Sequence, residues 1–257
     1  MINLIDIGNS NIVVATYDGE LMDTSRYTTD TTKSIDEYYT LLKDVLKDSK
    51  GMVISSVVPE LNIIFKNLAI KYLSFDPIFV GPGLKTGIKI MVDNPKEVGA
   101  DLVASAAAAI AHYGDDAIII DMGTATTITY IEKKVIKGVA ITAGLVTQRD
   151  CLIGGTSQLT QFEFKKPAHV VATNTVDCLN AGLLYGHAKM LEGMVGILKK
   201  NHDNIPVLLT GGAARFISDL VDESFIYDEY LLIKGLIVIS EKNIKKDIEF
   251  KKSYAVQ

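Results

Sequence analysis

Residues 117–126 read AIIIDMGTAT, and residues 2–11 read INLIDIGNSN. This pair of stretches decides the fold, because each is a short apolar run that ends in Asp-x-Gly and continues into hydroxyl or amide residues. Asp121 follows Asp6 by 115 residues, and Gly123 follows Gly8 by the same interval. The sequence therefore predicts two copies of one strand-and-loop unit, with a chance likeness between two hairpins as the alternative.

Both loops lead into a β-hairpin. After the first loop, residues 12–17 form a β-branched strand, Asp18-Gly19 favours a tight turn, and residues 21–28 form the return strand. After the second loop, residues 127–131 and 135–141 flank the charged turn at residues 132–134. The two hairpins come into register when the two aspartates are aligned, so the repeat extends beyond the loops.

The rest of the chain alternates strands with helices. Apolar spacing predicts helices over residues 32–47, from Pro59 onward, and over residues 101–113, 175–200 and 231–243, and strands over residues 51–58, 78–80 and 206–210. This alternation indicates an α/β fold, and the opening hairpin makes the sheet mixed. The repeat predicts two domains, residues 1–115 and residues 116–257.

Composition excludes several classes of protein. Hydrophobic residues make up 48% of the 257 residues and charged residues 22%, which excludes a disordered or collagen-like chain. The net charge of −5 is the opposite of what nucleic-acid binding favours. The two cysteines, Cys151 and Cys178, are too few for a disulfide framework, the N-terminus has no basic region of a signal peptide, and no apolar run is long enough to span a membrane. We expect a cytoplasmic protein with small-molecule partners or further copies of itself, and with neither a nucleic acid nor a membrane as partner.

Common catalytic motifs are missing from the sequence. There is no GxxxxGK[ST], GxSxG or HExxH, and residues 81–87, GPGLKTG, miss the dinucleotide pattern GxGxxG by one position. The four histidines, His112, His169, His187 and His202, are scattered, and the sequence favours ordinary polar or helix-surface roles for them over metal binding. These observations exclude a P-loop, a serine hydrolase elbow and a zinc helix.

The strand-end aspartates are the residues that point to chemistry. Each is followed by a glycine that lets a ligand approach the backbone, and then by N–H groups and small donors that suit phosphate oxygens. The carboxylate can hold a cation that offsets phosphate charge. Two such loops facing each other would hold a triphosphate, and Thr210-Gly211-Gly212 adds a third place where bare backbone can approach a nucleotide. The alternative is a pair of Asp-Gly turns without a ligand.

This combination resembles the phosphate-1, phosphate-2 and adenosine motifs of the acetate and sugar kinase, Hsc70 and actin superfamily. Within it, the chain resembles type III pantothenate kinases over nearly its whole length. The resemblance rests on residues 6–10 (DIGNS), 55–59 (SSVVP), 94–101 (NPKEVGAD), 121–127 (DMGTATT), 174–176 (NTV) and 210–212 (TGG). It implies duplicated ribonuclease H-like (actin-like ATPase) domains, each a mixed sheet flanked by helices, with a cleft between them.

The resemblance also implies roles for particular residues. The ATP contacts would be Asp6, Ile7, Gly8, Asn9, Ser10, Asn11, Thr124, Gly211 and Gly212. Asp121 would hold a monovalent cation, potassium or ammonium, while magnesium arrives with the ATP. Asp101 would be the general base that takes the proton from the pantothenate hydroxyl, in the first step of coenzyme A biosynthesis. Gly99, Ala100, Asp101 and Thr175 would line the pantothenate pocket, and the long helix over residues 175–200 would form a homodimer interface.

Two departures from the family pattern fall in the substrate half of this site. The family continues Gly-Ala-Asp-Arg, but here the fourth position is Leu102, and Val92 stands where the family usually has a tyrosine. Leucine cannot replace the charge-assisted donors of arginine. Three interpretations stay open: an active pantothenate kinase whose pocket compensates, a non-catalytic relative with a regulatory role, and a kinase for another small hydroxyl substrate. A third change, Ala143 in place of a frequent proline, concerns only a loop.

Overall fold

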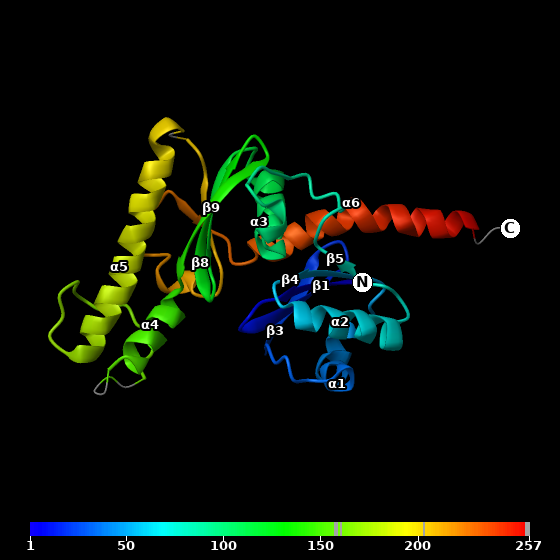
Figure 1. Ribbon diagram of the computed structural model, residues 1–257, viewed down its shortest axis with the longest axis horizontal. Coiled ribbons are helices and arrows are strands. Elements are labelled where there is room, and N and C mark those ends of the chain that lie inside the picture. Colours follow the sequence, from blue (N-terminus) through cyan, green and yellow to red (C-terminus); the bar gives the residue numbers. More distant parts are fainter. Residues whose placement is uncertain (157–158, 160, 203, 255–257) are drawn as a thin grey trace. The chain divides into compact units, whose positions relative to one another are not determined.

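The structure is a computed structural model that describes residues 1–156, 159, 161–202 and 204–254. The chain divides into two compact units, drawn in Figure 1. The first unit contains residues 1–88 and 93–112 together with the C-terminal helix from Leu231 onward. The second unit contains residues 89–92 and 113–230. Each unit has its own sheet and its own helices.

The first unit is built on a mixed sheet in the order β3-β2-β1-β4-β5. Its strands are β1 (Ile2–Ile7), β2 (Asn11–Tyr17), β3 (Leu21–Thr28), β4 (Met52–Ser56) and β5 (Ile78–Phe79). The hairpins β1–β2 and β2–β3 are antiparallel, whereas β4 runs parallel to β1 and β5 parallel to β4. Asp6 therefore lies at the carboxyl end of a strand that has a parallel neighbour.

Helices cover both faces of this sheet (Figure 1). Alternate residues of β1 point to opposite faces. Ile5 and Ile7 pack with α1 (Ile35–Leu46) and α2 (Pro59–Leu68), which a π-helical turn extends over Ala69–Leu73. Leu4 packs instead with α3 (Ala100–His112) and α6 (Leu231–Tyr254). The even-numbered positions of β1, including Asp6, therefore face the side of the sheet that carries α3.

Small residues allow α3 and α6 to pack closely. The α3 helix is rich in buried alanines, at positions 104 and 106–109, and α6 contacts it as well as β1 and β4. Gly235 of α6 is buried, and a Cβ atom added there would overlap the carbonyl oxygen of Ala104 and lie 3.2 Å from the Ala104 Cα. Because the obstacle is backbone, neither helix can yield without a shift of the whole element.

We expect the Gly235→Ala variant to lose about 3 kcal/mol of unfolding free energy, because overpacking a tight contact typically costs about 1–3 kcal/mol and occasionally more. The measurement is urea denaturation followed by circular dichroism. Gly154→Ala is the matched control, since Gly154 is exposed in a helix and a Cβ there meets nothing within 4 Å. Equal stability of the two variants would contradict the close packing of α6 on α3.

The second unit repeats the topology of the first. Its sheet has the order β11-β10-β7-β8-β9-β6, in which β7, β8 and β9 form antiparallel hairpins while β10 and β11 run parallel to β7. The strands are β6 (Lys89–Ile90), β7 (Ala117–Met122), β8 (Ala125–Glu132), β9 (Val135–Ala143), β10 (Val207–Thr210) and β11 (Phe225–Tyr227). Reading from β9 to β11 gives the same strand order and directions as reading from β3 to β5, which confirms the predicted mixed α/β sheets.

Two helices lie on one face of this second sheet, α4 (Leu145–Gly154) and α5 (Thr175–Leu198), followed by a 3₁₀ turn at Lys199–Asn201 (Figure 1). Ile118, Ile120 and Met122 of β7 pack into the core under these helices. The alternation of side chains then places Ile119 and Asp121 on the opposite face. Within the described residues, no helix is long and apolar enough to cross a membrane.

The elements differ from the sequence predictions at a few places. Helix α1 begins at Ile35 rather than Thr32, because Ser34 and Glu37 form a capping box that fixes the start. The glycines after Thr210 lead into a 3₁₀ turn, Ala214–Phe216, and the sequence does not predict α4. The C-terminal helix packs with the first unit, so the sequence halves 1–115 and 116–257 are not the same division as the two compact units.

Candidate active site

The first loop, Asp6 to Asn11, runs from the end of β1 to the start of β2, and its carbonyl groups accept hydrogen bonds within the protein. The Gly8 N–H donates to the Asn11 carbonyl at 2.9 Å, and the Thr29 hydroxyl donates to the Gly8 carbonyl at 2.6 Å. The Ile7 carbonyl accepts from the Val57 N–H at 3.0 Å. Asn9 and Ser10 are exposed at the tip of the loop. The tip of the predicted phosphate loop is therefore at the surface of the first unit.

Asp101 lies on the same face of the first sheet as Asp6. It is the second residue of α3, and α3 packs on the face to which Asp6 points. Ser55 is the residue of β4 that pairs in register with Asp6, so it faces the same side. A Cβ at Gly99 would overlap the Asp101 carboxylate and lie 3.6 Å from a methyl carbon of Val57, which follows β4. The fold thus places the first loop, the end of β4 and Asp101 around one region of the first unit.

The Asp101 carboxyl group is in an unusual electrostatic environment. It is partly buried, and this burial raises its pKa above the usual value, although a 2.8 Å hydrogen bond from the Leu102 N–H works in the opposite direction. A carboxylate that is poorly solvated binds a proton more readily than one in water. Shifts of this kind concentrate at catalytic sites, so the shift supports Asp101 as a candidate base.

The second loop, Asp121 to Thr126, runs in the same way from the end of β7 to the start of β8. The Gly123 N–H donates to the Ala125 carbonyl at 3.0 Å, as the Gly8 N–H does to Asn11 in the first loop. The Thr124 carbonyl accepts from the Gly144 N–H at 3.0 Å and from the Thr147 hydroxyl at 2.7 Å. Gly123 and Thr124 are exposed at the tip. The two loops thus share a hydrogen bond from the glycine N–H, but the second is one residue shorter: Asp6 pairs with Val13, seven residues on, whereas Asp121 pairs with Thr127, six residues on. The register predicted by aligning the two aspartates is therefore off by one residue after the loops.

The Thr210-Gly211-Gly212 motif lies beside the second loop. Thr210 ends β10 and pairs in register with Asp121 of the parallel strand β7. Gly211 has a φ of +92°, and a Cβ there would overlap the Asp121 carboxylate and lie 2.6 Å from the Met122 nitrogen. The Met122 carbonyl accepts from the Ala213 N–H at 3.0 Å. Two motifs that are about 90 residues apart in the sequence thus form one surface at the carboxyl ends of two parallel strands, where α/β sheets bind ligands.

Oxygen atoms gather beside the Asp121 carboxylate. Thr127 is directly opposite Asp121 across the β7–β8 hairpin, so the two side chains share a face. Within the described part of the chain, the Thr127 hydroxyl is buried and has no hydrogen-bond partner. Carboxylate and hydroxyl oxygens fit a hard cation such as potassium. Among the same residues, no group of three or more His, Cys, Asp or Glu side chains is placed to hold a metal ion.

The predicted substrate residues fall into both units. Gly99, Ala100 and Asp101 are partly buried in the first unit, whereas Thr175 is exposed at the start of α5 in the second. Asn174 caps α5, because its side chain accepts from the Asp177 N–H at 3.0 Å, and this cap fixes the position of Thr175. Leu102 is only 9% exposed, and Val92 is partly buried.

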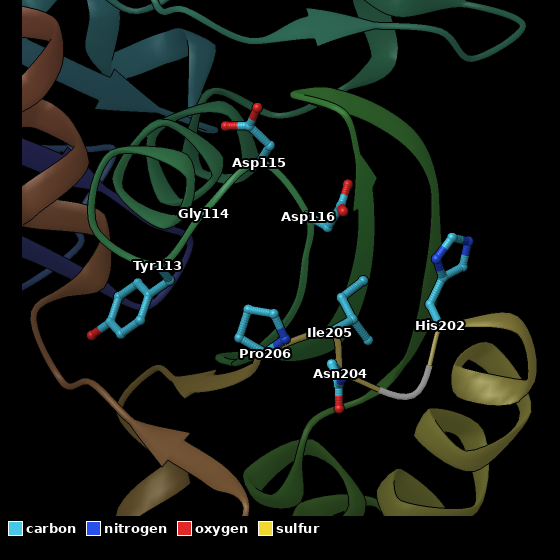
Figure 2. A pocket seen from close by; sticks show the side chains of 8 residues that line it. All are labelled: Tyr113, Gly114, Asp115, Asp116, His202, Asn204, Ile205 and Pro206. Atoms are coloured by element: carbon cyan, nitrogen blue, oxygen red, sulfur yellow. The ribbon is translucent and has the colours of Figure 1, made fainter.

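A separate pocket of about 400 Å³ lies at the other end of β7 (Figure 2). Its lining residues are Tyr113, Gly114, Asp115, Asp116, His202, Asn204, Ile205 and Pro206. The ionisable side chains among them already have protein partners. Asp115 pairs with Lys134 at 3.1 Å, Asp116 accepts from the Lys133 N–H at 2.6 Å and His202 lies 3.2 Å from Glu132. Tyr113 donates to Asp228 at 2.8 Å, and burial raises its pKa to about 12. The ionisable side chains of this pocket are therefore engaged in contacts within the protein, by an ion pair at Asp115 and by hydrogen bonds at Asp116 and Tyr113.

The structure also reveals a buried network that the sequence did not indicate. His187 of α5 lies 3.1 Å from the Thr126 hydroxyl at the end of the second loop, and 3.1 Å from the Gln148 side-chain nitrogen of α4. Burial lowers the pKa of His187. The sequence favours an ordinary polar role for His187, because nothing in its spacing connects it to a loop about 60 residues earlier.

Similar folds occur in several solved structures. A protein from Campylobacter jejuni described as a Baf family transcriptional activator has a TM-score of 0.61 at 20% identity, covering 95% of this chain and 100% of that one. A protein from Sinorhizobium meliloti described as a 2-dehydro-3-deoxygalactonokinase has a TM-score of 0.57 at 12% identity, covering 94% and 96%. MreB 5 of Spiroplasma citri, bound to AMPPNP, has a TM-score of 0.51 at 13% identity, covering 98% and 99%. At these identities the likeness concerns the fold.

The repeated mixed sheets, with an Asp-x-Gly loop at the end of β1 in one and of β7 in the other, define a protein of the actin-like ATPase and sugar kinase fold. The sequence profile of type III pantothenate kinases matches residues 3–196, which is most of the chain. The chain belongs to the type III pantothenate kinase family.

Proposed function

We propose that this protein transfers the γ-phosphoryl group of ATP to the primary hydroxyl group of pantothenate, the first step of coenzyme A biosynthesis. The observation that carries the proposal is the position of Asp101, a partly buried carboxylate with a raised pKa on the same sheet face as Asp6 of the first phosphate loop. Membership of the family supports the substrate. Gly99, Ala100 and Thr175 are the further proposed contacts to pantothenate.

The proposed chemistry requires mainly positioning and charge stabilisation. In this mechanism Asp101 accepts the proton of the pantothenate hydroxyl while that oxygen attacks the γ-phosphorus, the bond to the bridging oxygen breaks, and ADP leaves. Asp6 to Asn11, Thr124, Gly211 and Gly212 are the proposed contacts to ATP. A pKa above the usual aspartate value makes Asp101 a better base for this proton transfer.

We also propose that Asp121 holds a potassium or ammonium ion, which offsets phosphate charge when it is bound, while magnesium arrives with the nucleotide. The support is the buried Thr127 hydroxyl, which lies directly across the hairpin from Asp121 and on the same face of the sheet. The protein carries a net charge of −5, so a polyanionic nucleotide must be held by local donors and cations and not by the overall field.

The test is to incubate the protein with ATP, magnesium, potassium and pantothenate and to measure phosphopantothenate by mass spectrometry. We expect product, and a lower rate when sodium replaces potassium. Equal rates in the two salts would contradict the role of Asp121 in cation binding. ATP consumed with other alcohols but not with pantothenate would overturn the substrate assignment.

A kinase for another small hydroxyl substrate is the second candidate, and Leu102 favours it. This residue directly follows Asp101 and is 9% exposed, so an apolar side chain occupies the position where the family has an arginine. A substrate without a carboxylate would need no cationic donor there. If ATP binds but no alcohol is phosphorylated, the result supports a non-catalytic relative with a regulatory role. This would be in line with the fold shared with the Baf family protein.

We further propose that the protein is a cytoplasmic homodimer that uses the outer face of α5. Glycines 182, 186, 193 and 196 are exposed on this helix, and a Cβ at any of them would meet nothing within 4 Å. Each glycine costs an isolated helix about 1 kcal/mol relative to alanine, so a face of glycines is best explained by close packing of another helix. Val176 and Ile197, near the two ends of α5, are exposed as well.

The two free cysteines, both exposed, suit a reducing compartment such as the cytoplasm.

We expect the Gly186→Glu variant to be monomeric at concentrations where the wild type is dimeric. A symmetric contact between two α5 helices would bring the two glutamate side chains together, where they repel each other and do not fit. The protomer itself should gain helix stability, since glutamate is the better helix former. Sedimentation velocity at micromolar concentration measures the change, with Gly154→Glu in α4 as the matched control. A dimeric Gly186→Glu protein, or a monomeric wild type, would contradict the α5 interface.

A further inference from the structure

The second phosphate loop is held in place by hydrogen bonds to its backbone and by a series of buried side chains that contact one another. The carbonyls of Met122 and Thr124 accept hydrogen bonds from Ala213 and Gly144, which are outside the loop. Thr126 closes the loop, because it pairs with Met122 across the hairpin and its side chain is 0% exposed. The hydroxyl of Thr126 lies 3.1 Å from Nε2 of His187. The position of the loop is thus coupled to α5 at a single imidazole ring.

The Gln148 side chain fixes which nitrogen of His187 carries the proton. The Gln148 amide nitrogen is 2.7 Å from the Ala143 carbonyl, which can only accept, so this end of the amide is its NH₂ group. The same nitrogen is 3.1 Å from Nδ1 of His187. Nδ1 must therefore accept, and in a neutral ring the proton then resides on Nε2. Consequently His187 donates from Nε2 to the Thr126 hydroxyl.

The charged form of His187 does not fit this arrangement. A proton on Nδ1 would face the NH₂ group of Gln148, and turning the amide would break its bond to the Ala143 carbonyl. The ring is 3% exposed, so water cannot replace the lost partner. Burial lowers the His187 pKa, which agrees with a ring that stays neutral. The network therefore has one well-defined proton arrangement.

We propose that His187 is a positioning residue of the nucleotide site: its neutral Nε2–H form, set by Gln148, fixes Thr126 and so the loop from Asp121 to Thr126. This inference rests on the proposed function, in which that loop contacts ATP. His187 touches no nucleotide in this proposal. Its removal should weaken ATP binding through the loop and change pantothenate binding much less, because Gly99 to Asp101 are on another element and Thr175, at the start of α5, is 12 residues before His187.

The variants that test this role are His187→Leu, His187→Gln and Thr126→Val. Leucine removes the donor, whereas the terminal amide of glutamine can place an N–H near the position of Nε2. We expect His187→Leu to raise the ATP dissociation constant and KM about tenfold, which corresponds to about 1.4 kcal/mol, with little change in the KM for pantothenate. His187→Gln should retain most of the affinity. The double variant of His187→Leu and Thr126→Val should be little worse than either single variant, because both remove the same bond.

A spectroscopic measurement on the ligand-free wild type tests the proton arrangement without any activity. Long-range ¹H–¹⁵N NMR should show His187 as the Nε2–H tautomer near neutral pH, and His202→Gln, at an exposed histidine, is the control variant for assignment and binding. An Nδ1–H tautomer overturns the inference, and so does unchanged ATP affinity in His187→Leu when the wild type binds ATP. A wild type that shows the expected tautomer but binds no ATP overturns the proposed function instead.

Discussion

The Asp101→Asn variant is expected to lose phosphoryl transfer while it keeps ATP binding. A positioned general base contributes about 10²–10⁴-fold to the rate, so we expect kcat to fall about 10³-fold. The asparagine oxygen can still accept the 2.8 Å hydrogen bond from the Leu102 N–H, so the start of α3 should stay intact. The measurements are steady-state kinetics with pantothenate and direct titration with ATP. A variant that retains most of the wild-type rate would exclude Asp101 as the base.

The same substitution has a second consequence, in stability, that separates a catalytic role from a structural one. Burial raises the pKa of Asp101 in the folded state above its unfolded value, so the folded protein binds this proton more tightly. The associated stability is present at pH values below the unfolded pKa and is lost as the pH rises through the folded pKa. Near pH 7.5 the ionised carboxylate thus costs stability, and asparagine removes that cost.

We therefore expect Asp101→Asn to unfold at the same temperature as the wild type or higher, even though it is inactive. Asp93→Asn is the matched control, since Asp93 is an exposed aspartate in the segment before α3. It should change neither rate nor stability. If Asp101→Asn were inactive because it is unfolded, its circular dichroism spectrum would show this directly, and the result would not support a role as the base.

The parts of the fold that the sequence predicted are those with a local signal. The strands that contain Asp6 and Asp121 are mostly apolar runs, and turn residues separate them from the strands that follow, so their predicted positions agree closely with β1 and β7. The sequence does not predict helix α4, because its aliphatic residues are confined to its two ends, residues 145–146 and 152–153, with a mostly polar stretch between them. Leu145 is its buried residue. The position of α4 depends on the packing of Leu145 into the core of the second unit, which a local sequence pattern does not reveal.

The sequence also does not predict contacts between segments that are far apart along the chain. Nothing in the spacing of residues 231–254 indicates that they pack against α3, because the match depends on Gly235 lying against the Ala104 backbone. The link from His187 to Thr126 is of the same kind, since a single histidine in an apolar helix has no periodicity to interpret. By contrast, the sequence motifs single out both Asp121 and Gly211 as candidate ligand contacts, and the fold adds that the two residues lie against each other.

The contact between Asp121 and Gly211 leads to the second large effect, which is expected for Gly211→Ala. The alanine Cβ would overlap the Asp121 carboxylate and lie 2.6 Å from the Met122 nitrogen and 2.8 Å from the Met122 carbonyl carbon. A left-handed backbone costs a non-glycine residue about 1–2 kcal/mol, and overpacking adds about 1–3 kcal/mol. We expect a loss of about 3 kcal/mol in unfolding free energy, together with a large rise in the ATP dissociation constant as the second loop is displaced.

The control for this prediction is Gly19→Ala, which isolates the backbone strain. Gly19 has the same φ of +92°, but a Cβ there meets nothing within 4 Å, and it is in the hairpin turn between β2 and β3. Gly19→Ala should therefore lose only about 1–2 kcal/mol and bind ATP as the wild type does. The difference between the two variants in denaturant unfolding measures the steric conflict at Asp121. If Gly211→Ala were no less stable than Gly19→Ala and bound ATP normally, then Asp121 and Gly211 would not form one surface, and the proposed nucleotide contacts at both residues would fail together.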